Sequence, residues 1–411
     1  MEGIARHRAW RRTCAAPRVE ENLRGTADRE SARAAMRASQ NASASRTRQG
    51  QTDMWPDRKL LDLLEIEHPI IQAPMASATN PVIVAAVSNA GGLGSFGAAG
   101  TPSPKLRETI KAIRERTDRP FNINLFSAHT EEFDRDARPG PRLAKQLAAY
   151  HAEFGLGAVP APEPMFGPFD GQLEVLIEER VPVVSFHFGA DAAAVGKVHA
   201  AGAKVLCSAT TVDEAKTLER AGVDAIIAQG GEAGGHRGTF SIDYQRALIG
   251  TMALVPQVVD AVDVPVIAAG GVMDARGIVA CFALGASAVQ MGTAFLGCPE
   301  MSVLDAWRAS LRNAAAEDTK VTKAVSGRPA RAIRNRYIEE VEGLQEPLLP
   351  YPAQYSVSRA LRKSAAERND SGFMSMWAGQ GVGLMRDQPV DDFMRDLVDA
   401  AQILMARLGS R

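Results

Sequence analysis

The 411-residue sequence lacks the features of several protein classes. No apolar run approaches the roughly 18 residues that a membrane-spanning helix needs. The formal net charge is −1, so no strong electrostatic attraction to nucleic acid or to a membrane surface is expected. Aromatic residues make up only 6% of the chain, whereas glycine and alanine are common. This composition is typical of a tightly packed α/β protein and argues against disorder over most of the chain.

Several reactive patterns are missing as well. The four cysteines, Cys14, Cys207, Cys281 and Cys298, form no CxxC pair and favour free thiols in the reducing cytoplasm. The seven histidines form no HxH or HxxxH pair, so we expect no metal site. There is no GxSxG nucleophile elbow, and no lysine ends a predicted strand. Schiff-base and serine-nucleophile chemistry are therefore not expected.

The first 53 residues differ in composition from the rest. They contain eleven arginines and no lysine against six acidic residues, which gives a formal charge of +5 (11 minus 6). Such a segment cannot bury enough surface to offset the entropy of ordering it, so we expect residues 1–53 to be a disordered extension. Two origins remain open. One is a targeting peptide, against which the acidic residues argue. The other, which we favour, is that residues 1–53 are a translation of non-coding sequence and that the true start of the protein is Met54.

From His68 onward, short apolar runs alternate with amphipathic stretches. The runs are nearly continuous in Val, Ile, Leu and Ala, as in parallel strands that are covered on both faces. Eight strands are predicted in this way: Pro69–Pro74, Gly92–Gly97, Phe121–Phe126, Val181–Phe188, Lys204–Ser208, Ala225–Gln229, Val264–Ala269 and Ala288–Thr293.

The amphipathic stretches between these runs predict helices, several of which end at a glycine in the usual stop position. They are Asn80–Asn89, Pro104–Arg116, Gly171–Glu179, Asp191–Ala201, Val212–Ala221, Pro256–Val262 and Ala275–Leu284. Eight strands that alternate with helices within about 230 residues indicate the α/β class and a (β/α)8 TIM barrel. An open doubly wound sheet is the alternative, but it usually has a glycine fingerprint after its first strand.

Two segments add to the barrel of residues 54–299. Residues 127–170 follow the third strand and include a predicted helix at Pro141–Phe154. Loops after barrel strands open on the catalytic face, so this insertion is predicted to be a substrate lid, with a surface decoration as the alternative. Residues 300–411 are predicted to be a C-terminal helical extension. Its packing helices are predicted at Pro299–Ala315 and Arg395–Leu408.

Glycines gather at the carboxyl ends of the last three predicted strands. Gly270 and Gly271 follow strand seven, Gly292 ends strand eight, and residues 229–238 form a dense turn after strand six. Glycine lets main-chain N–H groups approach an anion, and the loops after strands seven and eight of such barrels commonly bind phosphate. We therefore predict a phosphate-anchored cofactor here. Plain tight turns and a flexible surface loop are the alternatives.

His187 is the leading candidate for acid–base chemistry. It ends the fourth strand, on the face where barrel enzymes keep such groups, and an imidazole with a pKa of about 6.5 can accept a proton at neutral pH. His236, in the glycine-rich turn, is the competitor, although it could instead contact a cofactor. His129 opens the insertion and ranks third, whereas His68 should face the opposite end of the barrel.

Motifs along this framework resemble those of the nitronate monooxygenase family, formerly called 2-nitropropane dioxygenases, which are FMN-dependent barrel enzymes. The resemblance runs from about Met54 to the C-terminus. It rests on Ile70–Met75, Ser88–Gly94, Asn124–Phe126, Ser185–Gly189, Glu232–Gly238, Ala269–Gly271, Gln290–Thr293, Ser326–Arg331 and Trp377–Gln380. One departure is Ala76–Thr79, where many members have a glycine.

The resemblance assigns roles to individual positions. It implies that His187 is the catalytic base. It implies FMN contacts at Asn124, Gln229, Gly234, Gly271, Gln290, Met291, Gly292 and Thr293. Ser326–Arg331 and Trp377–Gln380 are predicted loops that in the family help to cover the flavin; a structural corner and a buried tryptophan are the alternative interpretation.

The implied reaction is the oxidation of alkyl nitronates or nitroalkanes with O2 to carbonyl compounds and nitrite. His187 would first remove the α-proton of a neutral nitroalkane. The expected partners are the small-molecule substrate and O2, with a homodimer as one option. Two other functions stay open. One is an NAD(P)H-dependent flavin reductase of the enoyl-acyl-carrier-protein or quinone type, and the other is a non-catalytic barrel that binds a phosphate ligand.

Overall fold

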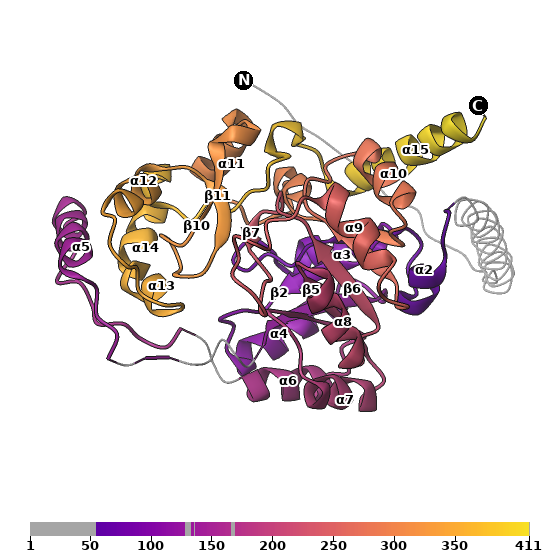
Figure 1. Ribbon diagram of the computed structural model, residues 1–411, viewed down its shortest axis with the longest axis horizontal. Coiled ribbons are helices and arrows are strands. Elements are labelled where there is room, and N and C mark those ends of the chain that lie inside the picture. Colours follow the sequence, from indigo (N-terminus) through magenta and orange to yellow (C-terminus); the bar gives the residue numbers. More distant parts are fainter. Residues whose placement is uncertain (1–54, 128–132, 135, 166–168, 411) are drawn as a thin grey trace, which may run out of the picture. The chain divides into compact units, whose positions relative to one another are not determined.

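Eight parallel strands form the centre of the structure (Figure 1). The computed structural model describes residues 55–127, 133–134, 136–165 and 169–410. The N-terminal extension, the predicted start at Met54 and the candidate His129 lie outside the described residues.

The strands pair in the order β1-β9-β8-β6-β5-β4-β3-β2, and every ladder is parallel. A parallel bridge between Ile71 and Leu93 links the two edge strands and closes the barrel. The prediction of a TIM barrel is confirmed. The strands are β1 (Ile70–Gln72), β2 (Gly94–Gly97), β3 (Phe121–Phe126), β4 (Val183–His187), β5 (Lys204–Ala209), β6 (Ala225–Gln229), β8 (Val266–Ala269) and β9 (Ala288–Met291).

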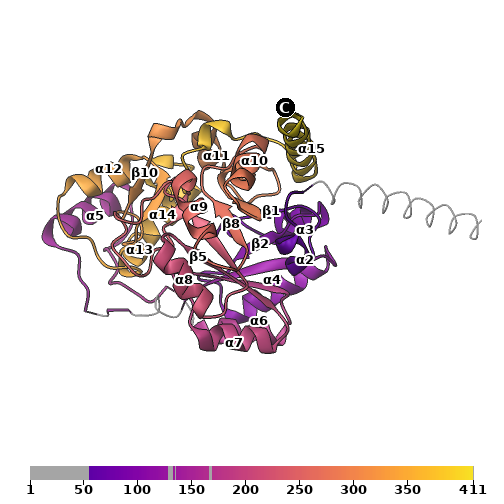
Figure 2. The same ribbon diagram turned by 45° about the vertical axis from the view of Figure 1, so that its right-hand side comes forward.

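Helices follow the strands around the outside of the barrel (Figures 1 and 2). They are α3 (Pro81–Asn89), α4 (Ser103–Arg114), α6 (Phe169–Glu178), α7 (Ala192–Ala200), α8 (Val212–Arg220), α9 (Thr251–Val259) and α10 (Ala275–Ala283), and α2 (Lys59–Leu64) precedes β1. The predicted helix at Pro256–Val262 was placed too late, because α9 begins at Thr251 and includes Pro256. Within the described ranges, no helix combines the length and apolar character needed to cross a membrane.

The eighth helix position is filled by the end of the chain. β9 leads only into the short 3-10 helix η2 (Thr293–Gly297), whereas α15 (Val390–Gly409) packs against both α10 and α3. The buried side chains of α15 recur at helical spacing, as a core-facing stripe requires: Val390, Phe393, Met394, Leu397, Val398 and Ala401. Part of the predicted extension therefore completes the barrel.

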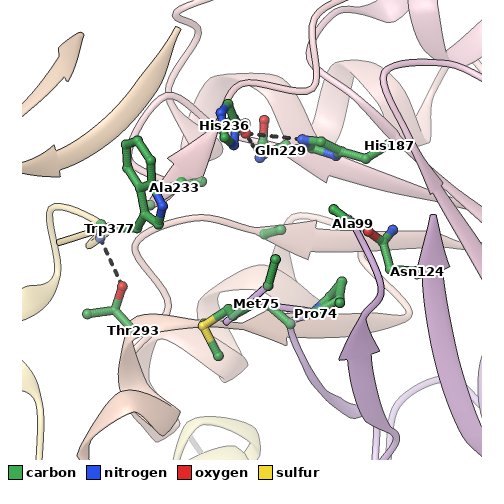
Figure 3. A pocket seen from close by; sticks show the side chains of 18 of the residues that line it. Pro74, Met75, Ala99, Asn124, His187, Gln229, Ala233, His236, Thr293 and Trp377 are labelled. Carbon is green, nitrogen blue, oxygen red and sulfur yellow. Dashed lines mark hydrogen bonds between the residues drawn. The ribbon is translucent and has the colours of Figure 1, made fainter. Parts of the chain in front are cut away.

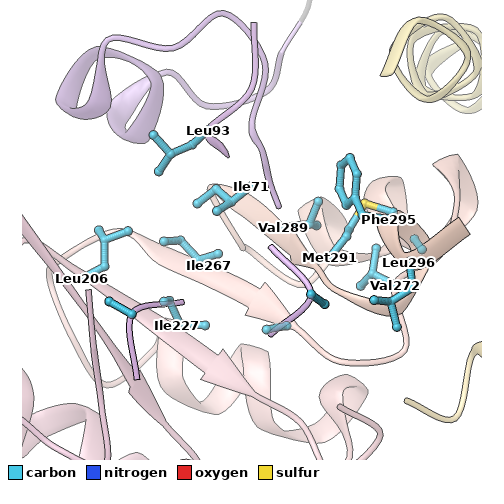
Figure 4. Packing of buried hydrophobic residues seen from close by; sticks show 14 of the residues in the cluster. Ile71, Leu93, Leu206, Ile227, Ile267, Val272, Val289, Met291, Phe295 and Leu296 are labelled. Carbon is cyan, nitrogen blue, oxygen red and sulfur yellow. The ribbon is translucent and has the colours of Figure 1, made fainter. Parts of the chain in front are cut away.

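The barrel interior is packed with apolar side chains. Ile71, Ile227 and Ile267 lie close to one another inside it, each no more than 2% exposed (Figure 4). Because successive residues of a strand point to opposite faces, Val289 of β9 lies on the outer side, near Phe295 (Figure 4). A filled barrel is a solid core, so a ligand can bind only at its end.

A second sheet of three short strands joins the glycine-rich turn to the C-terminal extension. β10 (Thr319–Thr322) pairs antiparallel with β11 (Ala330–Ile333), and β11 pairs with β7 (Gly235–His236), which lies within the turn. The prediction of a loop over Ser326–Arg331 was wrong for its last two residues, which begin β11. The extension is thus not purely helical.

The insertion packs against the helices of the extension (Figure 1). Tyr150 of the insertion donates a hydrogen bond to Glu340 (2.8 Å), and Arg336 pairs with both Glu153 (2.6 Å) and Glu340 (2.8 Å). The Tyr150 ring also meets Phe373 edge-on, with centroids 5.0 Å apart. The helices are α5 (Pro141–Glu153) in the insertion and α11 (Asp305–Asn313), α12 (Arg336–Gly343), α13 (Ala353–Val357) and α14 (Arg359–Glu367) in the extension.

Candidate active site

A cavity of about 440 Å³ opens at the carboxyl ends of the barrel strands (Figure 3). Its volume is within the range of ordinary small-molecule sites. The predicted site residues that line it are Asn124, His187, Gln229, Gly234, Gly271, Gln290, Gly292 and Thr293, together with the competitor His236. Met291 does not line it. The side chain of Met291 is buried and lies near Phe295 (Figure 4), so only its main chain could reach a ligand.

Both added segments border the same cavity. Met165 lines it from the insertion. The extension contributes Trp307, Tyr351, Tyr355, Arg359, Arg362, Trp377, Gly379 and Gly381. The main chain of Gly379 donates a hydrogen bond to Thr293 Oγ1 (2.9 Å; Figure 3), which ties the extension directly to the end of β9.

His187 ends β4, and its ring forms part of the cavity wall (Figure 3). Nδ1 lies 3.0 Å from Oγ of Ser208, and Nε2 lies 3.2 Å from the carbonyl oxygen of His236. Burial lowers the pKa of His187 to about 4, because the charged ring would lose its hydration. The imidazole is therefore neutral at pH 7 and able to accept a proton.

His236 lies on β7 in the same cavity. Its Nε2 is 3.0 Å from Oγ of Ser326, and that hydroxyl donates to the carbonyl of Arg328 (3.0 Å), so Nε2 carries the proton. The ring lies 5.2 Å from Trp377 and 5.8 Å from Tyr351, measured between centroids. Burial lowers the pKa of His236 to about 3, so this ring is neutral as well.

The turns after β8 and β9 present main-chain donors to the cavity. Among the described residues, the N–H groups of Gly271, Gly292 and Thr293 donate to no protein acceptor. Beside them, Oε1 of Gln290 is buried and has no hydrogen-bond partner. The φ angle of Gly271 is +74°, a conformation that favours glycine. Donors and an acceptor left unpaired in this way fit a phosphate-bearing cofactor that completes their hydrogen bonds.

The predicted flavin contacts on the strands are held in place by protein hydrogen bonds. The amide of Gln229 donates to the carbonyl of His236 (3.0 Å) and accepts from the N–H of Gly238 (2.8 Å). Asn124 donates to the main-chain carbonyl of Ser185 (3.1 Å). Gly234 packs against the main chain of the extension so closely that a Cβ would lie 2.6 Å from the carbonyl carbon of Ala378.

Two buried arginines, not predicted from the sequence, hold the carbonyls of the glycine-rich turn. Arg237 is 1% exposed and donates to the carbonyl oxygens of Gly230 and Gln229. Arg331 of β11 donates to the carbonyl oxygen of Gly231. Burial lowers the pKa of Arg237 to about 10, so the guanidinium stays charged at neutral pH. The sequence signal that could have identified these two arginines is their position within the motifs Glu232–Gly238 and Ser326–Arg331.

Two glutamates complete this framework through main-chain N–H groups. Glu214 of α8 is fully buried and accepts from the N–H groups of Thr210 (2.7 Å) and Phe240 (2.7 Å). Glu232 accepts from the N–H and the hydroxyl of Thr251 (2.9 Å each). Side chains therefore hold the main chain of the turn by hydrogen bonds despite its many glycines. Over the described ranges, no group of three or more His, Cys, Asp or Glu side chains could hold a metal ion.

Known proteins are similar to this chain in sequence and in fold. The family model described as nitronate monooxygenase matches residues 57–400. The chain is 45% identical to the nitronate monooxygenase of Pseudomonas aeruginosa over 342 residues, which cover 82% of this chain and 97% of that protein. It is 39% identical to a probable nitronate monooxygenase of Staphylococcus aureus strain Newman, over 86% of this chain and 99% of that protein.

Solved structures agree with this relationship. A nitroalkane oxidase from Streptomyces ansochromogenes superimposes with a TM-score of 0.78 at 37% identity, covering 85% of this chain and 99% of that chain. FabK from Thermotoga maritima is also similar, with a TM-score of 0.67 at 33% identity, covering 85% of this chain and 98% of that chain. The chain thus belongs to the nitronate monooxygenase family.

Proposed function

We propose that this protein is an FMN-dependent nitronate monooxygenase, which oxidises alkyl nitronates and nitroalkanes with O2 to carbonyl compounds and nitrite. The observation that carries the proposal is a neutral imidazole, His187, in the wall of the cavity that also holds the unpaired glycine N–H groups. The unpaired N–H groups of Gly271, Gly292 and Thr293 form what we call the phosphate cup. This cup alone would suit many phosphate-bearing ligands. A base beside it adds proton abstraction from carbon.

FMN is the cofactor that these groups suit. The N–H groups of Gly271, Gly292 and Thr293 would hold its phosphate, and Oε1 of Gln290 would accept a hydrogen bond from a hydroxyl group of FMN. Gln229 and Asn124 would contact the ring system from the strand ends. When bound, FMN would supply the redox chemistry that nitronate oxidation with O2 requires.

The chain's own contribution to the chemistry is a proton acceptor in the wall of the cavity. The rings of Phe126 and Phe188 pack against the ring of His187, with centroids 5.9 Å and 4.4 Å away. Removal of the α-proton makes a cation of His187 and an anion of the substrate together, so the two new charges stabilise each other. A preformed nitronate needs no such step.

The relatives support this proposal to different degrees. The Pseudomonas protein and the Streptomyces structure are named for reactions of nitronates and nitroalkanes. The likeness to FabK keeps an NAD(P)H-dependent flavin reductase as the alternative. A homodimer and a cytoplasmic location stay predictions, for which gel filtration and cell fractionation are the tests.

Nitrite release from ethylnitronate in air, with and without NADH, tests the function. We expect a yellow protein with a flavin spectrum that releases nitrite without NADH. Rapid bleaching of the flavin by NADH under anaerobic conditions, together with no nitrite, would instead identify a reductase. A colourless protein that binds only phosphate compounds would leave a non-catalytic barrel.

A further inference from the structure

The hydrogen bonds of His187 determine which of its nitrogens is basic. The carbonyl oxygen of His236, 3.2 Å from Nε2, can only accept, so Nε2 carries the proton of the neutral ring. The same carbonyl also accepts from Gln229 (3.0 Å), which fixes its position. The lone pair that can take up a proton therefore lies on Nδ1.

Nδ1 faces the hydroxyl of Ser208. The two atoms are 3.0 Å apart, and because Nδ1 has no proton, the hydroxyl donates to it. Ser208 lies on β5 and borders the cavity. Gly238 packs closely against both His187 and Ser208. A Cβ at this position would lie 3.0 Å from Cε1 of His187 and 3.1 Å from Cβ of Ser208. The ring of His187 is thus confined. The hydroxyl of Ser208 lies between its basic atom, Nδ1, and the cavity.

We propose that Ser208 is a second catalytic residue, which relays the α-proton of a nitroalkane to Nδ1 of His187. This inference rests on the proposed function. The C–H bond of the substrate breaks, and its electron pair moves into the nitro group, which becomes a nitronate. The proton passes to Oγ of Ser208 while the hydroxyl proton passes to Nδ1.

The products of this step are a nitronate anion and an imidazolium whose two protons both have acceptors. Nδ1–H donates to Ser208, and Nε2–H still donates to the carbonyl of His236. No ring rotation and no exchange of tautomers is required. The other charged and titratable groups around the ring are Arg328, Arg237 and His236, and the positive charges of the two arginines disfavour a charge on the ring. The nitronate formed alongside compensates for this effect.

Kinetics of the holoenzyme on two substrates provide the first test. Ser208→Ala should lower kcat/KM for nitroethane by at least about 100-fold, as expected for loss of a proton-transfer group, and should change turnover of ethylnitronate by no more than about twofold. The double variant with His187→Asn should be no slower than His187→Asn alone, because the two residues act as one unit.

Ser88→Ala is the matched control. Ser88 is also a buried serine, and its hydroxyl donates to the carbonyl of Pro120 (2.8 Å), but it lies on α3 and does not line the cavity. Both substrates should be turned over as in the wild type. If Ser208→Ala keeps nitroethane activity that His187→Asn loses, or slows both substrates equally, the relay is wrong. If the wild type uses neither substrate, the proposed function itself fails.

Nitrogen NMR of 15N-histidine-labelled holoenzyme gives a readout that is independent of turnover. His187→Asn identifies the signals of His187. We expect a protonated Nε2 and a bare, hydrogen-bonded Nδ1. In Ser208→Ala, the Nδ1 signal should move to the position of a nitrogen without a partner, while Nε2 stays unchanged. A proton on Nδ1 in the wild type, or an unmoved Nδ1 signal in the variant, would overturn the inference.

Discussion

Arg331 donates two hydrogen bonds to the single carbonyl oxygen of Gly231, which lies one hundred positions earlier in the chain. The distances are 3.1 Å from Nε and 2.8 Å from Nη2. A third bond, from Nη1 to Oγ1 of Thr319 (3.2 Å), joins the same guanidinium to β10. One side chain therefore fastens the glycine-rich turn to the second sheet.

Replacing Arg331 with lysine should loosen this turn. A lysine ammonium is a single point charge and cannot reproduce the planar fork, so we expect a loss of about 1–3 kcal/mol in unfolding free energy and weaker flavin binding. Urea unfolding and flavin fluorescence titration measure the two effects. Arg334→Lys is the control, because Arg334 is exposed and forms a surface ion pair with Glu339 (3.1 Å). Equal effects of the two changes would contradict this role of Arg331.

Replacing His187 with asparagine should affect the turnover of nitroethane and of ethylnitronate differently. Asparagine is similar in size but cannot accept the proton, so turnover of nitroethane should fall by about 100-fold or more, while ethylnitronate is affected much less. Flavin absorbance should show normal occupancy. His236→Asn, a change of the other cavity histidine, identifies the base by comparison. A selective loss in His236→Asn and none in His187→Asn would assign the base to His236.

The pH dependence of nitroethane oxidation should reflect the lowered pKa of His187. A base works in its unprotonated form, and with a pKa of about 4 this form dominates at all higher pH values. The value of kcat/KM should therefore stay level as the pH falls from about 7.5 to about 5, and should decline only as the pH nears 4. An exposed imidazole would lose half its activity at a pH of about 6.5. A midpoint there would show that the base is not desolvated.

Gly292→Ala should weaken cofactor binding without unfolding the protein. A Cβ at this position would meet Ala73 Cβ at 3.5 Å and Met75 Sδ at 3.7 Å, which are ordinary contacts, but the methyl group would occupy the phosphate cup. We expect at least about tenfold weaker FMN binding, which corresponds to about 1.4 kcal/mol of binding free energy. Gly343→Ala is the control, since a Cβ there meets nothing within 4 Å. Unchanged flavin content in Gly292→Ala would argue against the cup.

The barrel was predictable because its signals are local. Each strand is a buried apolar run, and β6 was predicted with its observed bounds, Ala225–Gln229. The last strand was predicted too long, because Gly292 is the N-cap of the 3-10 helix η2 and Thr293 is its first residue. The rule that functional groups gather at the carboxyl ends of barrel strands placed His187 and Gln229 at the cavity.

The second sheet and the buried charges were not predictable in the same way. β7 is two residues long, so it has no periodicity, and its partner Arg331 is far away in the sequence. An arginine such as Arg237 is expected at the surface. Its burial becomes favourable because main-chain carbonyl oxygens of the folded turn accept hydrogen bonds from its guanidinium. The side chain of Met291 points to the outer face because of its place in the strand alternation, which the resemblance did not reveal.

The link between the glycine-rich turn and the extension also bears on the order of synthesis. A ribosome that has made residues 1–299 has supplied all eight barrel strands, but not β11 or the main chain at Gly379 and Gln380, which binds to Thr293 and Glu232. α15, which fills the last helix position, is made later still. A nascent barrel still attached to the ribosome would therefore have a cavity without the part of its wall that the extension supplies.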